Sequence, residues 1–232
     1  MSTVKDAAFM SRRDAARTKL DQLPGNYAND SAGRLVFFDA VYEEAKNDAA
    51  AVPWADLEPK GYLLKWLRNN PGEAERAIDI GCGLGDNAEA IAAHGYQTTG
   101  FDVAAKAITW AQNRFPQTDV AYQVADLFNV PEQWAGGFDL VHECFTLQAL
   151  PPEILSETVE AVCGLVASGG TLLVYTRYRE NGAHASGPPW PIEECFLDQP
   201  KHYGLSKVHE ERTVVTRGDK SVPHHFSIWK KQ

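Results

Sequence analysis

The chain has 232 residues, a formal net charge of −9 and a pI near 5.2, with 44% hydrophobic and 23% charged residues. This composition is typical of a globular protein with a core, and the length favours one generous α/β domain. An acidic balance without a Lys/Arg cluster disfavours nucleic acid or an anionic membrane as a partner. No stretch approaches the roughly 18 to 20 apolar residues that a membrane span needs, and the first 20 residues lack an apolar signal core, which favours the cytoplasm.

The cysteines and histidines do not form a metal-binding pattern. The four cysteines lie far apart with no CxxC pair, so we expect them to be reduced and mostly buried. His224 and His225 are neighbours in an expected strand, where successive side chains point to opposite faces, so they cannot share one ion. We therefore predict no metal site.

The first third of the chain reads as helical. Amphipathic spacing predicts helices over 6–23 and 34–47, the second with Val36, Phe37, Val41 and Tyr42 near one side. A third helix is expected over 62–70, before the turn pair at 71–72. We assign residues 1–60 to an N-terminal helical cap segment and 61–232 to the main domain, a single domain overall.

From residue 76 onward strands and helices alternate. The expected strands are 76–81, 97–102, 120–125, 138–144 and 171–177, and the expected helices are 86–94, 104–115 and 152–167. Such alternation predicts right-handed crossovers and a parallel sheet. Two further strand-like runs, 207–216 and 224–231, are joined by the polar turn 217–223 and predict an antiparallel hairpin at the end of the sheet.

A glycine cluster follows the first strand directly, in the segment "AIDIGCGLG" over 77–85. Glycines between a parallel strand and a helix let the backbone approach a ligand at the strand's carboxyl end. The glycines fall as G-x-G-x-G, which differs from the dinucleotide spacing G-x-G-x-x-G. Asp79, two residues before Gly81, would repel a diphosphate but could receive an ammonium group.

A second acid, Asp102, stands 23 residues after Asp79 at the end of the second strand. A carboxylate at this position is suited to accepting the two hydroxyl hydrogens of a ribose. Asp102 could instead cap the following helix, or perform both roles.

Four segments in this order resemble the class I S-adenosylmethionine-dependent methyltransferases: 77–85, 99–115, 123–128 ("QVADLF") and 136–153 ("GGFDLVHECFTLQALPPE"). The resemblance covers roughly residues 62–180. It implies a Rossmann-like sheet of seven mostly parallel strands flanked by helices, ending in the antiparallel hairpin. It also implies S-adenosylmethionine as cofactor and a methyl acceptor as partner.

The resemblance assigns cofactor contacts to particular residues. It places Asp79 and the backbone of Gly81, Cys82 and Gly83 beside the methionine part, with Cys82 as a small residue that fits the bend rather than a nucleophile.

The remaining contacts concern the nucleoside. The resemblance places Asp102 on the ribose hydroxyls and Val103 against the adenine. Asp126 and Leu127 would flank the adenine edge, although Asp126 could simply end a strand.

A narrower resemblance is to the thiopurine, thiol and halide methyltransferase branch, through residues 37–67 and "ALPPE" after the fourth strand. It implies that Trp54 covers the methionine end of the cofactor; the alternative is a buried aromatic residue of the cap. That branch carries an Asp-Arg pair after the fourth strand, where this chain has Glu143 and Cys144.

The acceptor side is expected at the ends of the fourth and fifth strands. His142 and Glu143 emerge there and suit a hydrogen bond to cofactor or substrate, with Glu143 a candidate to take a proton from an acceptor. Residues 176–196 form a candidate lid, whose Tyr178 could face the sulfonium.

These features predict an enzyme that transfers a methyl group to a small molecule through S, N or O by in-line displacement, with Glu143 and Tyr178 on its catalytic side. One alternative is a methyltransferase that acts on RNA or protein. The other is a nucleoside- or NAD-binding protein without transfer activity.

Overall fold

The computed structural model describes residues 7–185, 187–217 and 220–232. The chain divides into two compact units, the first formed by Met1–Ala74 and Cys82–Ala125, the second by Glu75–Gly81 and Asp126–Gln232. The N-terminal helices thus share a unit with the segment after Gly81, and the division at residue 60 stays our proposal. Within the described ranges, no helix has the length and apolarity needed to cross a membrane.

The first unit is mainly helical. Its elements are α1 (Ala7–Arg17), α2 (Ser31–Ala45), α3 (Gly61–Asn69), α4 (Asp86–Ala92), β2 (Gln97–Asp102), α5 (Ala105–Arg114) and β3 (Ala121–Val124). Strands β2 and β3 pair in parallel, α4 packs on β2, and α5 contacts both strands. The alternation expected over 86–125 is confirmed, with boundaries that shift by one or two residues.

Helix α2 begins where Asp30 accepts a hydrogen bond from the Gly33 amide at 2.7 Å, an ordinary N-cap. The predicted apolar side is confirmed for three residues, all buried: Phe37, Val41 and Tyr42. Val36 was assigned to the same side, and this is wrong, because it is 46% exposed. Successive helical residues lie about 100° apart, so the neighbour of a core residue can point to solvent.

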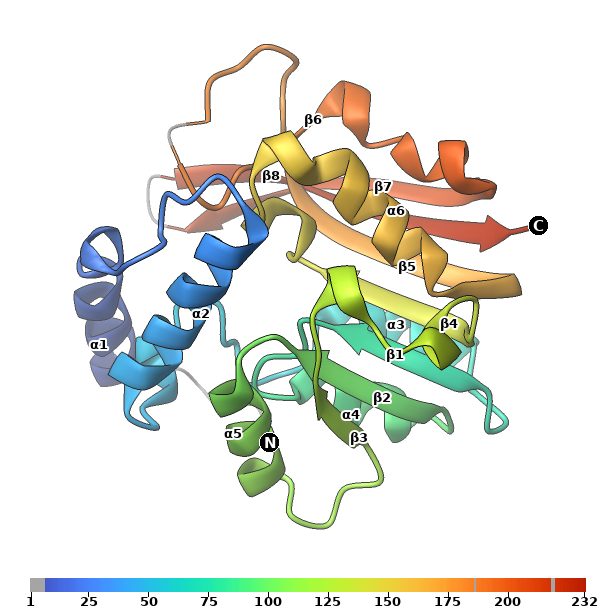
Figure 1. Ribbon diagram of the computed structural model, residues 1–232, viewed down its shortest axis with the longest axis horizontal. Helices are drawn as coiled ribbons and strands as arrows, with labels where there is room; N and C mark the ends of the chain where they lie inside the picture. Colours follow the sequence, from blue (N-terminus) through green and yellow to red (C-terminus); the bar gives the residue numbers. More distant parts are fainter. Residues whose placement is uncertain (1–6, 186, 218–219) are drawn as a thin grey trace. The chain divides into compact units, whose positions relative to one another are not determined.

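The second unit holds most of the strands. Its elements are β1 (Arg76–Ile80), β4 (Phe138–Cys144), α6 (Leu155–Gly164), β5 (Val166–Arg179), β6 (Ile192–Glu193), β7 (Leu205–Arg217) and β8 (Lys220–Lys231). The strand order is β1-β4-β5-β8-β7, as Figure 1 shows. β1, β4 and β5 run parallel, whereas β8 is antiparallel to both β5 and β7, which confirms the terminal hairpin. Residues 218–219 of the predicted turn lie outside the described residues.

Two details of β5 differ from the prediction. The helix expected to reach residue 167 ends at Gly164, and the strand already begins at Val166. Its pairing with β4 is interrupted between Phe138 and Leu140, and Gly169 there has a φ of +76°, so the glycine pair allows a bulge that the helical spacing hid. The short strand β6, whose two residues pair in parallel with the end of β5, is not predicted from the sequence.

Gly85, the last glycine of the cluster, has a φ of +92°, and a Cβ added there would lie 2.2 Å from the Tyr122 hydroxyl oxygen. We expect Gly85→Ala to lower the free energy of unfolding by about 2 to 5 kcal/mol, from left-handed strain and overpacking together. Urea denaturation measures this. Gly61→Ala is the matched control, because a Cβ at Gly61 has no atom within 4 Å. Equal losses in the two variants would contradict the prediction.

Candidate active site

All three glycines of the cluster have left-handed backbone. Their φ angles are +59° at Gly81, +54° at Gly83 and +92° at Gly85. A Cβ on Gly81 would also lie 2.9 Å from the Thr146 hydroxyl oxygen, in the loop after β4. The tight bend predicted from the sequence therefore requires glycine at each position, and side chains are kept away from the backbone there.

In the first unit, Asp102 ties the glycine loop to helix α5. Its Oδ2 accepts from the Gly83 amide at 3.0 Å, and its Oδ1 accepts from the Ala104 amide at 2.9 Å. The side chain thus bonds the residue just before α5, but this residue, Ala104, is itself the N-cap and has no side-chain cap bond, so the alternative that Asp102 caps the helix is wrong. The position of Asp102 at the end of β2 fits the predicted contact with ribose hydroxyls, which stays a prediction.

Tyr42, which the sequence analysis placed only in an apolar stripe, faces the same loop. A Cβ on Gly83 would lie 3.3 Å from its hydroxyl oxygen, and Trp54 Nε1 donates to that oxygen at 3.1 Å. Burial, then the charges of Asp102 and Cys82, raise the pKa of Tyr42 well above its usual value, against the opposing Trp54 bond. Tyr42 is therefore a neutral hydroxyl at the glycine loop.

Trp54 is half-buried in an aromatic cluster. Its ring lies edge-on to Phe38 and Tyr42, with centroids 5.9 Å apart in both cases, and 6.3 Å from Phe37. These contacts fit the interpretation of Trp54 as an aromatic residue of the cap. One face of the ring is partly exposed, and its contact with the cofactor stays a prediction.

In the second unit, Asp79 and His142 pair across β1 and β4. The two residues are register partners, and Asp79 Oδ1 lies 2.6 Å from His142 Nδ1. Both side chains are almost completely buried. Asp79 Oδ2 has no hydrogen-bond partner among the described residues. A buried carboxylate oxygen without a donor is costly, so this atom is suited to an ammonium group. His142 contacts the other oxygen, and its predicted contact with the cofactor stays a prediction.

Glu143 is fully buried at the end of β4. Its Oε1 accepts from the amides of Thr146 at 2.6 Å and Leu147 at 3.0 Å, whereas Oε2 has no partner among the described residues. Burial raises the pKa of Glu143 to about 8, helped by the nearby charge of Asp79 and opposed by the amide bonds. The carboxyl group can therefore give or take a proton near neutral pH.

The backbone after Glu143 is unusual. Phe145 has a φ of +71° although it carries a side chain, and its amide donates to the Tyr175 carbonyl at 3.0 Å. Non-glycine residues in this region cost energy and gather at functional sites. The strain supports the carboxyl end of β4 as a functional candidate; the positive φ of Phe145 itself has no signal in the sequence.

The residues expected near the adenine have less distinctive environments. Asp126 is exposed, and its Oδ1 accepts from the Phe128 amide at 3.0 Å in a turn over Leu127–Asn129. Leu127 is buried, and Val103 is half-buried. Their adenine contacts stay predictions.

Tyr178 lies at the far end of β5, away from Glu143. The register pairs Glu143 with Val174, and Tyr178 follows four residues later, about 13 Å along the strand at about 3.3 Å per residue. Tyr178 pairs with Ile192 of β6. The structure therefore does not bring the two expected catalytic side chains together within the second unit.

The candidate lid is tied down through Gln148, a buried residue that the sequence analysis did not single out. Its side-chain oxygen accepts from the Arg177 amide at 2.5 Å and the Thr176 hydroxyl at 3.2 Å. Its backbone oxygen accepts from the Trp190 amide at 2.7 Å. Farther along, Arg179 pairs with Glu193 at 2.7 Å. The lid is thus anchored at both ends; residue 186 is outside the described residues.

A family model described as a methyltransferase domain matches residues 77–170. A ubiquinone biosynthesis O-methyltransferase from Aromatoleum aromaticum is 35% identical over 124 residues, 52% of each chain. A 2-heptyl-1-hydroxyquinolin-4(1H)-one methyltransferase from Mycobacteroides abscessus is 25% identical over 78% of this chain and 82% of its own. The chain spans about half to three fifths of the length of several ubiquinone-pathway relatives.

Solved structures show the same fold. A 1,6-didemethyltoxoflavin N1-methyltransferase from Burkholderia thailandensis superposes with a TM-score of 0.65 at 14% identity, over 85% of this chain and 87% of its own. An S-adenosylmethionine-dependent methyltransferase from Methanosarcina mazei gives 0.60 at 18% identity, over 72% and 96%. The predicted Rossmann-like α/β fold is therefore confirmed.

The residues of the candidate site fit S-adenosylmethionine. In the second unit, the Asp79 oxygen without a partner suits an ammonium group, and the left-handed backbone at Gly81 keeps side chains away from the loop. In the first unit, Asp102 is a carboxylate at the end of β2, the position expected for a ribose. The matched segment 77–170 contains all three features. The chain therefore contains a segment, residues 77–170, that matches the methyltransferase-domain family model, and S-adenosylmethionine is the methyl donor that this similarity indicates.

Proposed function

We propose that the protein transfers the methyl group of S-adenosylmethionine to a small-molecule acceptor. The observation that carries the proposal is the unpaired, buried Asp79 oxygen beside the glycine loop, within the segment that matches the methyltransferase family model. The relatives support a small acceptor, because their names specify ubiquinone biosynthesis and a hydroxyquinolone.

The cofactor supplies a methyl group that is already activated by its sulfonium. The chain's own residues have to bind, orient and exclude water. In our proposal, Asp79 holds the ammonium while His142 fixes the carboxylate in place. Asp102 accepts from the ribose hydroxyls, with Val103, Asp126 and Leu127 at the adenine.

We propose a hydroxyl oxygen as the acceptor atom. Glu143 supports this, because a carboxylate with a pKa of about 8 can take the proton of a weakly acidic hydroxyl near neutral pH. The O-methyltransferase relatives agree with this choice. Glu143 holds the proton until it passes to solvent, and Tyr178, about 13 Å farther along β5, contacts the end of the acceptor that is remote from the methylated oxygen.

A sulfur acceptor is the second candidate, from the resemblance to the thiopurine, thiol and halide branch. Trp54 supports it through its half-exposed ring, which could cover the methionine end of the cofactor. A thiolate needs no proton acceptor, so this reading gives Glu143 no catalytic task.

Two experiments test the proposal in sequence. Calorimetry compares S-adenosylmethionine with NAD, and we expect binding of the first only. Methyl-labelled cofactor is then offered with 3,4-dihydroxybenzoate, benzylamine, 4-nitrothiophenol and iodide, and separately with total RNA and with protein extract. Label on the hydroxyl compound supports the proposal, and label on the thiol supports the second candidate. Binding of NAD alone, or label only in RNA or protein, would overturn it.

A further inference from the structure

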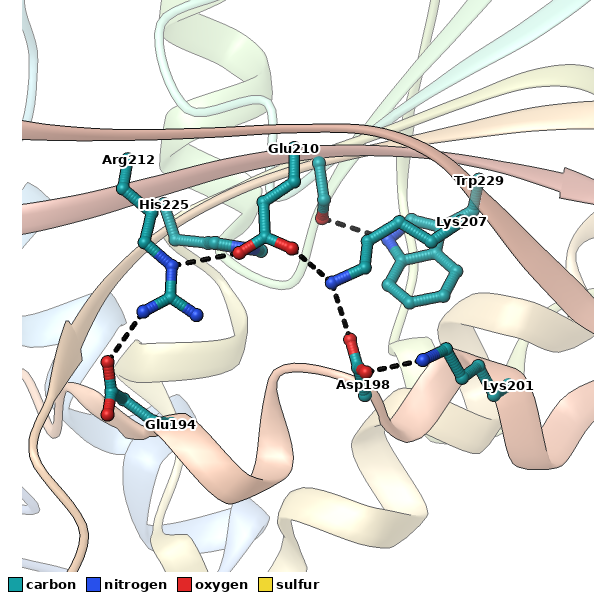
Figure 2. A network of polar contacts seen from close by, with 9 residues as sticks. Glu194, Asp198, Lys201, Lys207, Glu210, Arg212, His225 and Trp229 are labelled. Carbon is teal, nitrogen blue, oxygen red and sulfur yellow. Dashed lines mark hydrogen bonds and ion pairs between the residues drawn. The ribbon is translucent and has the colours of Figure 1, made fainter.

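One guanidinium joins three segments of the second unit at the far end of β5. Arg212 of β7 pairs through Nη1 with Glu194 Oε1 at 2.6 Å and through Nε with Glu210 Oε1 at 2.8 Å (Figure 2). Its Cζ atom also lies 5.2 Å from the ring centroid of Tyr178. Arg212 thus contacts β7, the segment after β6 and the end of β5.

The strand register explains this meeting. Arg212 pairs with His225, and His225 pairs with Thr176 of β5. Tyr178 is two residues beyond Thr176 and so points to the same face, diagonal to His225. The rings of Tyr178 and His225 accordingly lie edge-on with centroids 6.4 Å apart. The β7–β8 hairpin therefore packs against the ring of Tyr178.

The Glu210 carboxylate, which pairs with Arg212, also has other partners. Glu210 also binds Lys207, and the Lys207 ammonium reaches Asp198 at 2.6 Å, as Figure 2 shows. The hydrogen bond from Lys207 is the first cause that lowers the pKa of Glu210 to about 2. Burial lowers the pKa of His225, although Glu210 opposes this. At neutral pH, Glu210 is therefore ionised and the neighbouring His225 is neutral.

We propose that Arg212 is a positioning residue for the acceptor, which fixes the Tyr178 ring and the segment 192–196 in one arrangement. This rests on the proposed function, in which the end of the acceptor remote from Glu143 lies beside Tyr178. A planar guanidinium can pair with two carboxylates and stack on a ring at once, which an ammonium cannot. Because the side chains of Arg212 and Glu194 are 45% and 34% exposed, their ion pair contributes little to global stability.

Arg212→Gln and Arg212→Lys test the proposal. In hydrogen exchange without ligand, we expect amides over 178–185 and 190–196 to exchange about tenfold faster in both variants, with the midpoint of thermal unfolding shifted by a few degrees at most. For the panel compound that the wild-type protein methylates fastest, KM should rise about tenfold. The dissociation constant for S-adenosylhomocysteine should stay within twofold.

Lys201→Gln is the matched control, since it removes an exposed cation of the same network that pairs with Asp198 instead of Glu194. It should leave the exchange of the lid and the acceptor KM unchanged. Unchanged lid exchange in both Arg212 variants would overturn the positioning role, whatever the activity. An equal loss in the control would overturn it as well. If the wild-type protein methylates no compound of the panel, the proposed function fails. Faster amide exchange of the lid in the Arg212 variants would still support the positioning role of Arg212.

Discussion

Asp79→Asn should weaken binding of S-adenosylmethionine by about ten- to a hundredfold, with little effect on the ligand's nucleoside contacts. Asparagine keeps an oxygen that can accept from His142 Nδ1, but it removes the charge that faces an ammonium group. Charge-assisted hydrogen bonds are worth about 1.5 to 3 kcal/mol, which corresponds to this range of affinity. Isothermal calorimetry measures the change directly.

The control for this variant is a second ligand. 5′-Methylthioadenosine keeps the nucleoside and lacks the amino-acid part, so Asp79→Asn should leave its dissociation constant within twofold. Asp102→Asn provides the matched comparison, because a residue at the ribose should affect both ligands. If Asp79→Asn weakened the two ligands equally, the ammonium assignment would be lost.

Glu143→Gln should have opposite effects on turnover and stability. Removing a proton acceptor costs about 10²- to 10⁴-fold in kcat. The glutamine oxygen can still accept from the amides of Thr146 and Leu147, so the loop after β4 keeps its two bonds. A loss of this size with unchanged cofactor affinity would mark Glu143 as the proton acceptor, whereas unchanged kcat would favour the sulfur candidate.

The stability effect follows from the pKa of Glu143, which is about 8 in the folded protein against 4.5 for the ordinary side chain. As pH rises above 4.5, the unfolded chain loses this proton first, so the stability contribution of the neutral carboxyl group is lost between pH 4.5 and 8. At pH 8 the difference is on the order of 4 kcal/mol. Glu143→Gln should therefore be more stable than the wild-type protein at pH 8.

Urea denaturation at pH 5 and pH 8 measures this difference, which should nearly vanish at the lower pH. Glu211→Gln, on the exposed face of β7, is the control and should show no comparable gain at pH 8. An equal effect of Glu143→Gln at both pH values would mean that the carboxyl group does not titrate near pH 8.

The elements that the sequence predicted well share a local signal. The strands at 97–102 and 138–144 are confirmed at their predicted bounds, because turn-forming glycines stand just before both, at Gly95 and at residues 136–137. At the boundary between α6 and β5, the predicted helix end is three residues too late and the predicted strand start five residues too late. The apolar residues Leu165 and Val166 continue the helical spacing, and only pairing with Phe138 assigns Val166 to the strand.

The sequence predicts single residues of the candidate site better than it predicts how they are arranged in space. The glycine loop, Asp79 and Asp102 carry a spacing that one sequence reveals. The burial of Glu143 and the strained Phe145 depend on the loop that folds back over β4, which leaves no periodic trace. Tyr42 likewise reads as an ordinary core residue until its hydroxyl is seen facing Gly83. Such features arise from tertiary contacts between distant segments.

Gln148 matters for any attempt to change the methyl acceptor of the proposed reaction. Its single amide side chain and backbone oxygen connect the loop after β4 with the start of the lid and with Trp190. A lid grafted from a related protein would therefore lose its anchor unless the donor's residue at this position came with it. Libraries that vary 176–196 should accordingly vary Gln148 as part of the same cassette.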